Sequence, residues 1–292
     1  MMGTQMIKQL REAISNLNPQ DVRDITERPV SITLFASSTN MYEEMESFFA
    51  PPAVSPQKRA ELRHVLQRTG DSTLPAALEV YEEGMPHPES GFVYHADNPK
   101  RVVWEIMEKH PDLQLSLARH IYPFRDPVVH QIIKVVSKEN ALFSLATAVP
   151  SILPFISLPW AVGEFASDTA FLTMNQVRMA FQIAGASDRN IGYREQRAEM
   201  ASLVAGAFGW RAIARELVGH IPMGGGLIPK AAVAYAGTYV VGLSLERFYR
   251  IGYGYTRQER KAAYETAYQH GKSVAKAFLD SHRPSQRSKQ PA

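Results

Sequence analysis

The stretch from Ala141 to Gly163, ALFSLATAVPSILPFISLPWAVG, carries no charged side chain. Its length reaches the ~20 residues that a helix needs to cross a bilayer. Prolines at positions 150, 154 and 159 oppose a single straight helix, because each removes a hydrogen-bond donor and disfavours helix in the residue before it. The stretch predicts two short helices joined by a kinked corner, either buried in a helical domain or in contact with lipid.

We do not expect the corner Pro150–Pro159 to cross the membrane as one helix. The hydrogen bonds lost at the prolines would stay uncompensated in a medium without water. A second span would also have to return the chain. The next uncharged run, Ala231 to Leu245, covers only about 22 Å as a helix, short of a ~30 Å hydrocarbon core. A buried or re-entrant hairpin costs less free energy than a topology in which both segments cross the membrane.

Downstream of residue 112 the hydrophobic pattern is helical throughout. Small residues recur every four positions at Ala201, Ala205 and Gly209 and again at Ala232 and Ala236, a spacing that lets helix backbones approach closely. Helices are expected at roughly 113–121, 126–139, 141–149, 165–185, 193–218, 229–250 and 256–280. We therefore predict a helical domain over 113–280 and a disordered basic tail over 281–292.

Upstream of residue 113, short β-branched runs alternate with helical patterns. Strands are expected at Val30–Ala36 and Phe92–His95, whereas 76–82 reads as either strand or helix. Helices are expected at 5–18 (ended by Asn18-Pro19), 41–49 (capped by Asn40), 57–68, and 99–110 (capped by Asp97 or Asn98). The prediction is α+β, mainly α: a small α/β region over 1–112, followed by a helical domain with hydrophobic helical hairpins.

The loop Ser37–Asn40 follows a strand and precedes a helix, where nucleotide-binding proteins place a phosphate loop. It has neither the glycines nor the lysine of a Walker motif. Glu43 and Glu44 are expected in the first turn of the next helix, where they would repel a phosphate. Gly271-Lys272-Ser273 lies inside a helical pattern and Gly224–Gly226 reads as a turn. No cofactor is expected.

No pattern of catalytic or metal-binding residues is present. The nine histidines are scattered, and neither an i,i+4 pair, nor H-E-x-x-H, nor G-x-S-x-G occurs. We expect no catalytic residue, no metal site and no enzymatic activity, although residues that converge only in space would escape this reasoning.

Composition and charge limit the cellular compartment and the kinds of partner that can be expected. The absence of cysteine fits a reducing compartment, and the N-terminus lacks the apolar segment of a signal peptide. The net charge of +3 is mild and forms no basic stripe, so nucleic acid is not an expected partner. These features predict a cytoplasmic protein.

Several segments between residues 121 and 250 resemble a known family. They are IYPFRDPVVHQIIKVVSKENALFSLATAVP, PWAVGEFASDTAFLTMNQVRMAFQIAG, IPMGGGLIP and AVAYAGTYVVGLSLERFY. The pattern is similar to the domain-of-unknown-function family 697, and the resemblance extends over residues 121–250, a little under half of the chain. The matching positions are Asp168, Gln176, Arg178-Met179, Pro222, Gly224, Gly226, Thr238-Tyr239 and Gly242.

The resemblance implies a bacterial helical domain that often follows a GTP-binding domain or belongs to inner-membrane proteins. GTP hydrolysis is not carried over, because the loop after the first strand lacks glycine and lysine. We expect a non-enzymatic protein that binds the inner face of a membrane or a partner, either a GTPase or a second copy of the chain. The alternative is a soluble regulatory module whose α/β region binds a ligand or protein.

The matching positions give structural candidates: Asp168, Gln176, Gly224, Gly226, Thr238 and Gly242. We expect Asp168 and Gln176 to be buried polar residues of the helical domain. A buried polar group needs a partner, and either the triple-glycine turn or the Thr238–Tyr239 segment can supply it.

Overall fold

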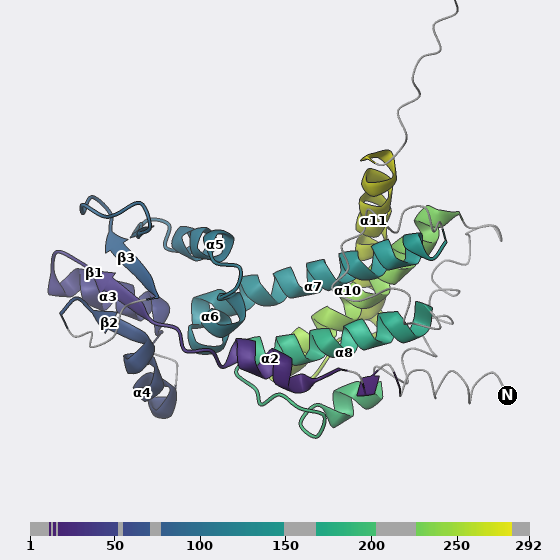
Figure 1. Cartoon of the computed structure of the whole chain (residues 1–292), viewed down its shortest axis with the longest axis horizontal. Coiled ribbons are helices and arrows are strands. Elements are labelled where there is room, and N and C mark those ends of the chain that lie inside the picture. Colours follow the sequence, from purple (N-terminus) through teal and green to yellow (C-terminus); the bar gives the residue numbers. More distant parts are fainter. Residues whose placement is uncertain are drawn as a thin grey trace, which may run out of the picture. The chain divides into compact units, whose positions relative to one another are not determined.

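The computed structural model describes residues 12, 14–15, 17–51, 55–70, 77–148, 168–202 and 226–281 (Figure 1). Contacts divide the chain into two compact units. The α/β unit comprises Asn18–Ile132 and Phe181–Glu195, and the helical unit comprises Met1–Leu17, Ile133–Ala180 and Gln196–Ala292. The fold is α+β and mainly helical, as the sequence predicts.

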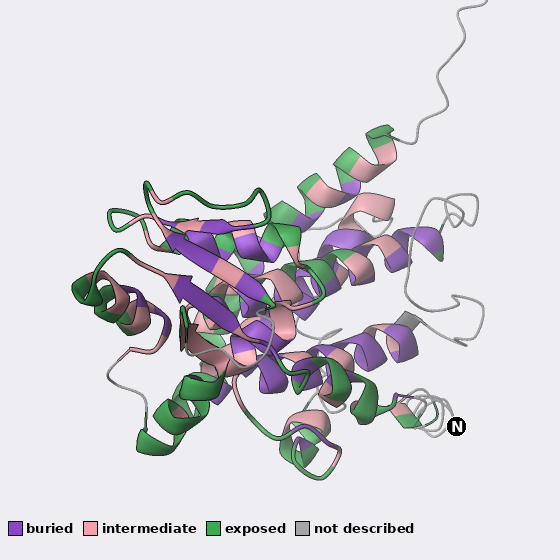
Figure 2. Cartoon of the chain, turned by 60° about the vertical axis from the view of Figure 1, so that its left-hand side comes forward, coloured by how far each residue is buried: buried purple, intermediate pink, exposed green. Residues whose placement is uncertain are grey.

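The α/β unit contains a parallel four-stranded sheet with the order β2-β1-β3-β4. Its strands are β1 (Ile32–Phe35), β2 (Leu66–Arg68), β3 (Leu78–Glu82) and β4 (Phe92–Tyr94). Strands β1, β3 and β4 are mostly buried, whereas the edge strand β2 is of intermediate burial (Figure 2). Ile32, Leu34 and Val80 are fully inaccessible. The strand prediction is confirmed for β1 and β4. The segment 76–82, for which either strand or helix is expected, contains β3.

Helices α2 (Pro19–Thr26), α3 (Thr39–Phe49), α4 (Pro56–Val65), α5 (Lys100–Lys109) and α6 (Gln114–His120) belong to this unit. α3 contacts β1 and β2, α4 contacts β2, and α5 contacts β4. The prediction that Asn18-Pro19 only ends a helix misses α2. Asn18 caps α2 through its side chain and Pro19 occupies the first turn, a pairing that favours a helix start.

Three local predictions in this unit are wrong. Ser38, not Asn40, caps α3, because its hydroxyl accepts from the N–H of Met41. α5 is preceded by Pro99 and receives no side-chain cap from Asp97 or Asn98. The helix expected to reach residue 68 ends at Val65, because residues 66–68 pair with β1 as an edge strand, and this pairing outweighs local propensity.

The helical unit is built mainly from α7 (Tyr122–Ala146), α8 (Asp168–Ala186), α10 (Leu227–Ile251) and α11 (Arg257–Ser281), of which α7 and α8 also contribute residues to the α/β unit. The predicted helices 126–139 and 141–149 form one continuous helix, α7. The break expected between these two helices falls at Asn140. Its buried side chain donates a hydrogen bond to Thr238 of α10, and α7 continues through this position. Tertiary hydrogen bonding replaces the local competition that makes asparagine a poor helix former.

α10 and α11 pack closely around small residues. A Cβ placed on Gly271 of α11 would lie 2.8 Å from the Cβ of Tyr235 and 3.0 Å from the Cα of Ala232. Ala236, Tyr264 and the other core side chains of this helix pair are buried. The predicted small-residue spacing in 229–250 therefore lies at a helix contact, and Gly271 is a packing residue inside a helix, as expected from its pattern.

Only the beginning of the uncharged stretch 141–163 is described. Residues 141–146 belong to α7, where Ala141, Leu145 and Ala146 are fully buried. The predicted proline corner Pro150–Pro159, and Gly224 in the expected turn, lie outside the described residues, as does most of the helix predicted at 193–218.

The division into units differs from the predicted boundary at residue 112. Residues 113–132 and 181–195 group with the sheet rather than with the helical residues 133–180. The α/β unit is therefore discontinuous in sequence, and its second segment arrives after the chain has passed through part of the helical unit. The predicted tail 281–292 is described only at Ser281.

Candidate functional site

A buried polar network joins α7, α8 and α10 inside the helical unit. Thr238 on α10 is fully buried, and its hydroxyl oxygen accepts hydrogen bonds from Asn140 Nδ2 at 2.7 Å and Gln176 Nε2 at 3.2 Å. The contact expected between Gln176 and the Thr238 segment is present. Asn140 on α7 is the member of the network that no sequence pattern indicates.

The network continues to a largely buried ion pair between Glu139 and Arg178. Asn175 Nδ2 donates to Asn140 Oδ1 at 2.9 Å and to Glu139 Oε2 at 3.0 Å. The same carboxylate oxygen accepts from the guanidinium of Arg178. Burial lowers the pKa of Arg178, while Glu139 acts in the opposite direction. Each charge offsets the cost of desolvating the other. Because Glu139 belongs to α7 and Arg178 to α8, the pair helps to fix these two helices relative to each other.

The remaining predicted residues have separate roles. A Cβ on Gly242 of α10 would lie 2.7 Å from Cγ1 of Ile133 on α7, so the absence of a side chain permits this helix contact. Gly226 precedes α10 with φ −63°, and nothing lies within 4 Å of an added Cβ. Asp168 begins α8, but its side chain lies outside the part of the chain that the structure describes, so its predicted burial stays a prediction.

The second arrangement of polar residues lies at the carboxyl end of the sheet. The chain leaves β1 for β2 on one side and then crosses to β3 on the other, which makes the ends of β1 and β3 a topological switch point. Ligands of open parallel sheets bind at such points. Ser37 follows β1, Glu82 ends β3, and His95 follows β4.

The carboxylate of Glu82, at the end of β3, lies against the loop that follows β1. The backbone N–H of Ser37 donates to Glu82 Oε2 at 2.6 Å, and this hydrogen bond lowers the pKa of Glu82. The expectation that Glu43 and Glu44 repel phosphate from the first turn of α3 is wrong, since that turn contains no acidic residue. Glu82 provides the negative charge instead, and it disfavours a phosphate in this loop.

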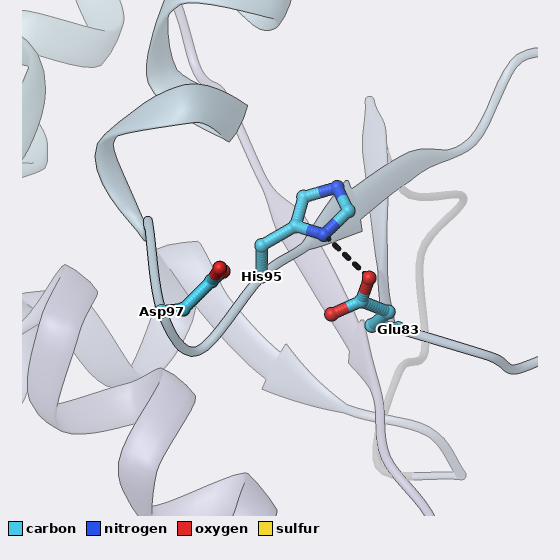
Figure 3. Close-up of side chains that lie close together, drawn as sticks. All are labelled: Glu83, His95 and Asp97. Atoms are coloured by element: carbon cyan, nitrogen blue, oxygen red, sulfur yellow. Dashed lines mark ion pairs between the residues drawn. The ribbon is translucent and has the colours of Figure 1, made fainter.

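Beside the switch point, Glu83, His95 and Asp97 come together (Figure 3). Glu83 Oε1 lies 3.0 Å from Nδ1 of His95, and one potential ligand atom from each of the three residues lies within 4.8 Å of the others. The N–H of Glu83 donates to the carbonyl of Tyr94, which continues the pairing of β3 with β4 and places Glu83 beside His95. No sequence pattern indicates this cluster, because Glu83 and His95 are brought together only by strand pairing.

The third feature is the corner between α10 and α11, defined here as residues 246–261. Phe248, Ile251 and Tyr253 are large hydrophobic residues with exposed fractions of 38%, 43% and 59%. The corner also contains five basic and two acidic residues. Gly252 ends α10 in the left-handed region at φ 87°, which lets the chain reverse directly after Ile251.

Polar contacts hold this corner in place. Thr256 and Glu259 form a capping box at the start of α11: the N–H of Thr256 donates to Glu259 Oε2 at 2.8 Å, and the N–H of Glu259 donates to Thr256 Oγ1 at 3.3 Å. Arg247 donates to the other carboxylate oxygen at 2.6 Å and lies over the rings of Tyr253 and Tyr255. The Arg247 hydrogen bond and the capping hydrogen bonds lower the pKa of Glu259 to about 2. The exposed apolar side chains thus stand on a structured turn.

Comparison with protein-family models, with curated proteins and with solved structures finds no match to this chain. Among the described residues, no helix combines the length and the apolar character needed to cross a membrane.

Proposed function

We propose that this chain is a non-enzymatic protein of the cytoplasm that attaches peripherally to the inner face of a membrane through the α10–α11 corner. The observation that carries the proposal is the exposure of Phe248, Ile251 and Tyr253 beside an excess of basic residues. Large apolar side chains that gather at one exposed turn are typical of an interaction surface. The positive charge of the corner favours an anionic surface as the partner.

The chemistry of the corner suits a lipid interface. Apolar side chains enter the boundary between headgroups and acyl chains, while tyrosine places its hydroxyl at headgroup level. Each basic residue near an anionic leaflet contributes roughly 1 kcal/mol. Arg257, Arg260 and Lys261 are exposed in the first turns of α11. Apolar contact and charge attraction therefore act at the same turn.

A GTPase acting in trans is the protein partner that fits this proposal. Its support is the resemblance of residues 121–250 to a domain that often accompanies GTP-binding domains. Attachment to a membrane would bring the chain to the surface where such a partner works. We expect the chain itself to hydrolyse no GTP, since its first strand is followed by a loop without the required glycines and lysine.

Vesicle sedimentation tests the attachment. The full chain is incubated with vesicles of phosphatidylcholine alone, and with vesicles containing about a third phosphatidylglycerol. We expect binding to the anionic vesicles that weakens as salt rises. The triple variant Phe248→Ser, Ile251→Ser, Tyr253→Ser should reduce partitioning at least ~10-fold, since it removes the apolar area that enters the interface.

The matched control is the double variant Trp104→Ser, Tyr122→Ser, which removes similarly exposed aromatic residues from the α/β unit. It should bind vesicles like the parent chain. Equal binding by the parent and the triple variant would refute the proposal. So would vesicle-independent self-association that the triple variant abolishes, because the corner would then join copies of the chain.

A further inference from the structure

We propose that Glu83, His95 and Asp97 bind a divalent transition-metal ion of the zinc class at the carboxyl edge of the sheet. The inference goes beyond membrane attachment and concerns the α/β unit alone. It rests on a mixed donor set, one imidazole nitrogen and two carboxylates, gathered at the edge where parallel sheets bind their ligands (Figure 3).

Strand pairing and a turn fix the backbone of the cluster. Glu82 pairs with Tyr94, and the N–H of Glu83, the first residue after β3, donates to the carbonyl of Tyr94. The N–H of Asn98 donates to the carbonyl of His95, so the chain turns immediately after the histidine and holds Asp97 near it. The ligands therefore come from positions whose backbone is set before any ion binds.

The geometry is close to that of a bound ion. Nitrogen and oxygen ligands about 2.0–2.2 Å from zinc lie roughly 3.4 Å apart in a tetrahedral site. Glu83 Oε1 and His95 Nδ1 are already 3.0 Å apart. One potential ligand atom from each of the three residues, Asp97 included, lies within 4.8 Å of the others. Glu83 and Asp97 are exposed, so their side chains can close the remaining distance by changing rotamer.

The donor set indicates the class of ion. Imidazole nitrogen suits zinc and its neighbours in the first transition row, whereas magnesium and calcium prefer oxygen ligands alone. Nδ1 of His95 faces the carboxylate of Glu83 at 3.0 Å. A bound ion would lie between these two side chains. The carboxylate of Glu82, which accepts the Ser37 N–H, lies at the same edge of the sheet.

Three protein ligands leave at least one coordination position for water or a further ligand. Such an open site would let the α/β unit bind an anionic group only when the ion is present. This would overcome the repulsion that Glu82 exerts on a phosphate in the metal-free loop. The metal site therefore supplies a means by which an otherwise acidic sheet edge can recognise a carboxylate or phosphate.

Isothermal titration calorimetry of the full chain with zinc chloride tests the inference, and cobalt(II) absorption in the visible range provides an independent spectroscopic readout. We expect one site whose dissociation constant rises at least ~100-fold in His95→Ala, because losing a direct ligand exceeds the 10–100-fold effect of an outer-shell partner. Glu83→Gln and Asp97→Asn should each weaken binding as well. The cobalt bands should disappear in His95→Ala.

The matched controls are His87→Ala and Glu89→Gln, exposed residues in the loop between β3 and β4. They should leave zinc binding and the cobalt bands unchanged. Absence of binding up to millimolar zinc, or binding that survives His95→Ala, would overturn the inference. Vesicle binding of His95→Ala should equal that of the parent chain, so failure of the metal site and failure of membrane attachment are separate results.

Discussion

At the scale of single residues, Thr238 is the central acceptor of the helical unit. One hydroxyl oxygen receives amide donors from α7 and α8, so three helices meet at a single side chain. Replacing it with valine keeps the shape and leaves two buried amide donors, those of Asn140 and Gln176, without this acceptor. We expect Thr238→Val to lower the free energy of unfolding by about 1–3 kcal/mol, measured by urea denaturation.

Two substitutions make that measurement specific. Thr238→Ser keeps the oxygen and should recover most of the loss. Thr266→Val changes an exposed threonine of α11 and should stay within about ±0.5 kcal/mol of the parent. If Thr238→Val were as stable as Thr266→Val, the network would contribute nothing to the packing of these helices.

At the scale of elements, the contact of α10 with α11 depends on glycine. In Gly271→Ala the new Cβ would meet the Cβ of Tyr235 at 2.8 Å and backbone atoms of Ala232 from 3.0 Å. Backbone atoms cannot move aside without shifting the helix, so we expect a loss of about 1–3 kcal/mol in the free energy of unfolding despite the better helix propensity of alanine.

Gly237 of α10 provides the control. It is also a buried helical glycine, but nothing lies within 4 Å of an added Cβ. Gly237→Ala should therefore be neutral or stabilise by up to ~1 kcal/mol. Thermal unfolding followed by circular dichroism distinguishes the two variants, and a loss in Gly237→Ala equal to that in Gly271→Ala would contradict the packing argument.

At the scale of the whole molecule, the α/β unit is completed by a distant segment. Residues 181–195 supply the carbonyl of Ile191, which accepts from Arg23 at 2.5 Å, and the carboxylate of Asp188, which lies 2.8 Å from Lys58 Nζ. Ala186 accepts from Arg125 at 3.1 Å. A fragment 18–132 lacks these partners and should unfold at a lower temperature than the same fragment with peptide 181–195 added. A scrambled peptide should give no shift, and equal melting in all three samples would contradict this role.

The sequence by itself determined the features that depend on local pattern. Runs of β-branched and aromatic residues predict β1 and β4, and the helical periodicity after residue 112 predicts α8, α10 and α11. That Gln176 needs a buried partner could also be anticipated, because a polar group inside an apolar core requires one. The choice of Thr238 over the triple-glycine turn could not be anticipated. The predicted strands and helices follow from side chains within one or two turns of each other.

Only the tertiary structure decided which distant segments meet. The edge strand β2 exists because β1 offers it hydrogen-bonding partners, although its own residues favour helix. α7 continues through Asn140 because Thr238 and Asn175 satisfy its amide. Glu83 approaches His95 through the register of β3 and β4, and residues 181–195 belong to the α/β unit although they are distant from it in sequence. Each of these contacts is long-range, so its free energy depends on residues that a local pattern does not contain.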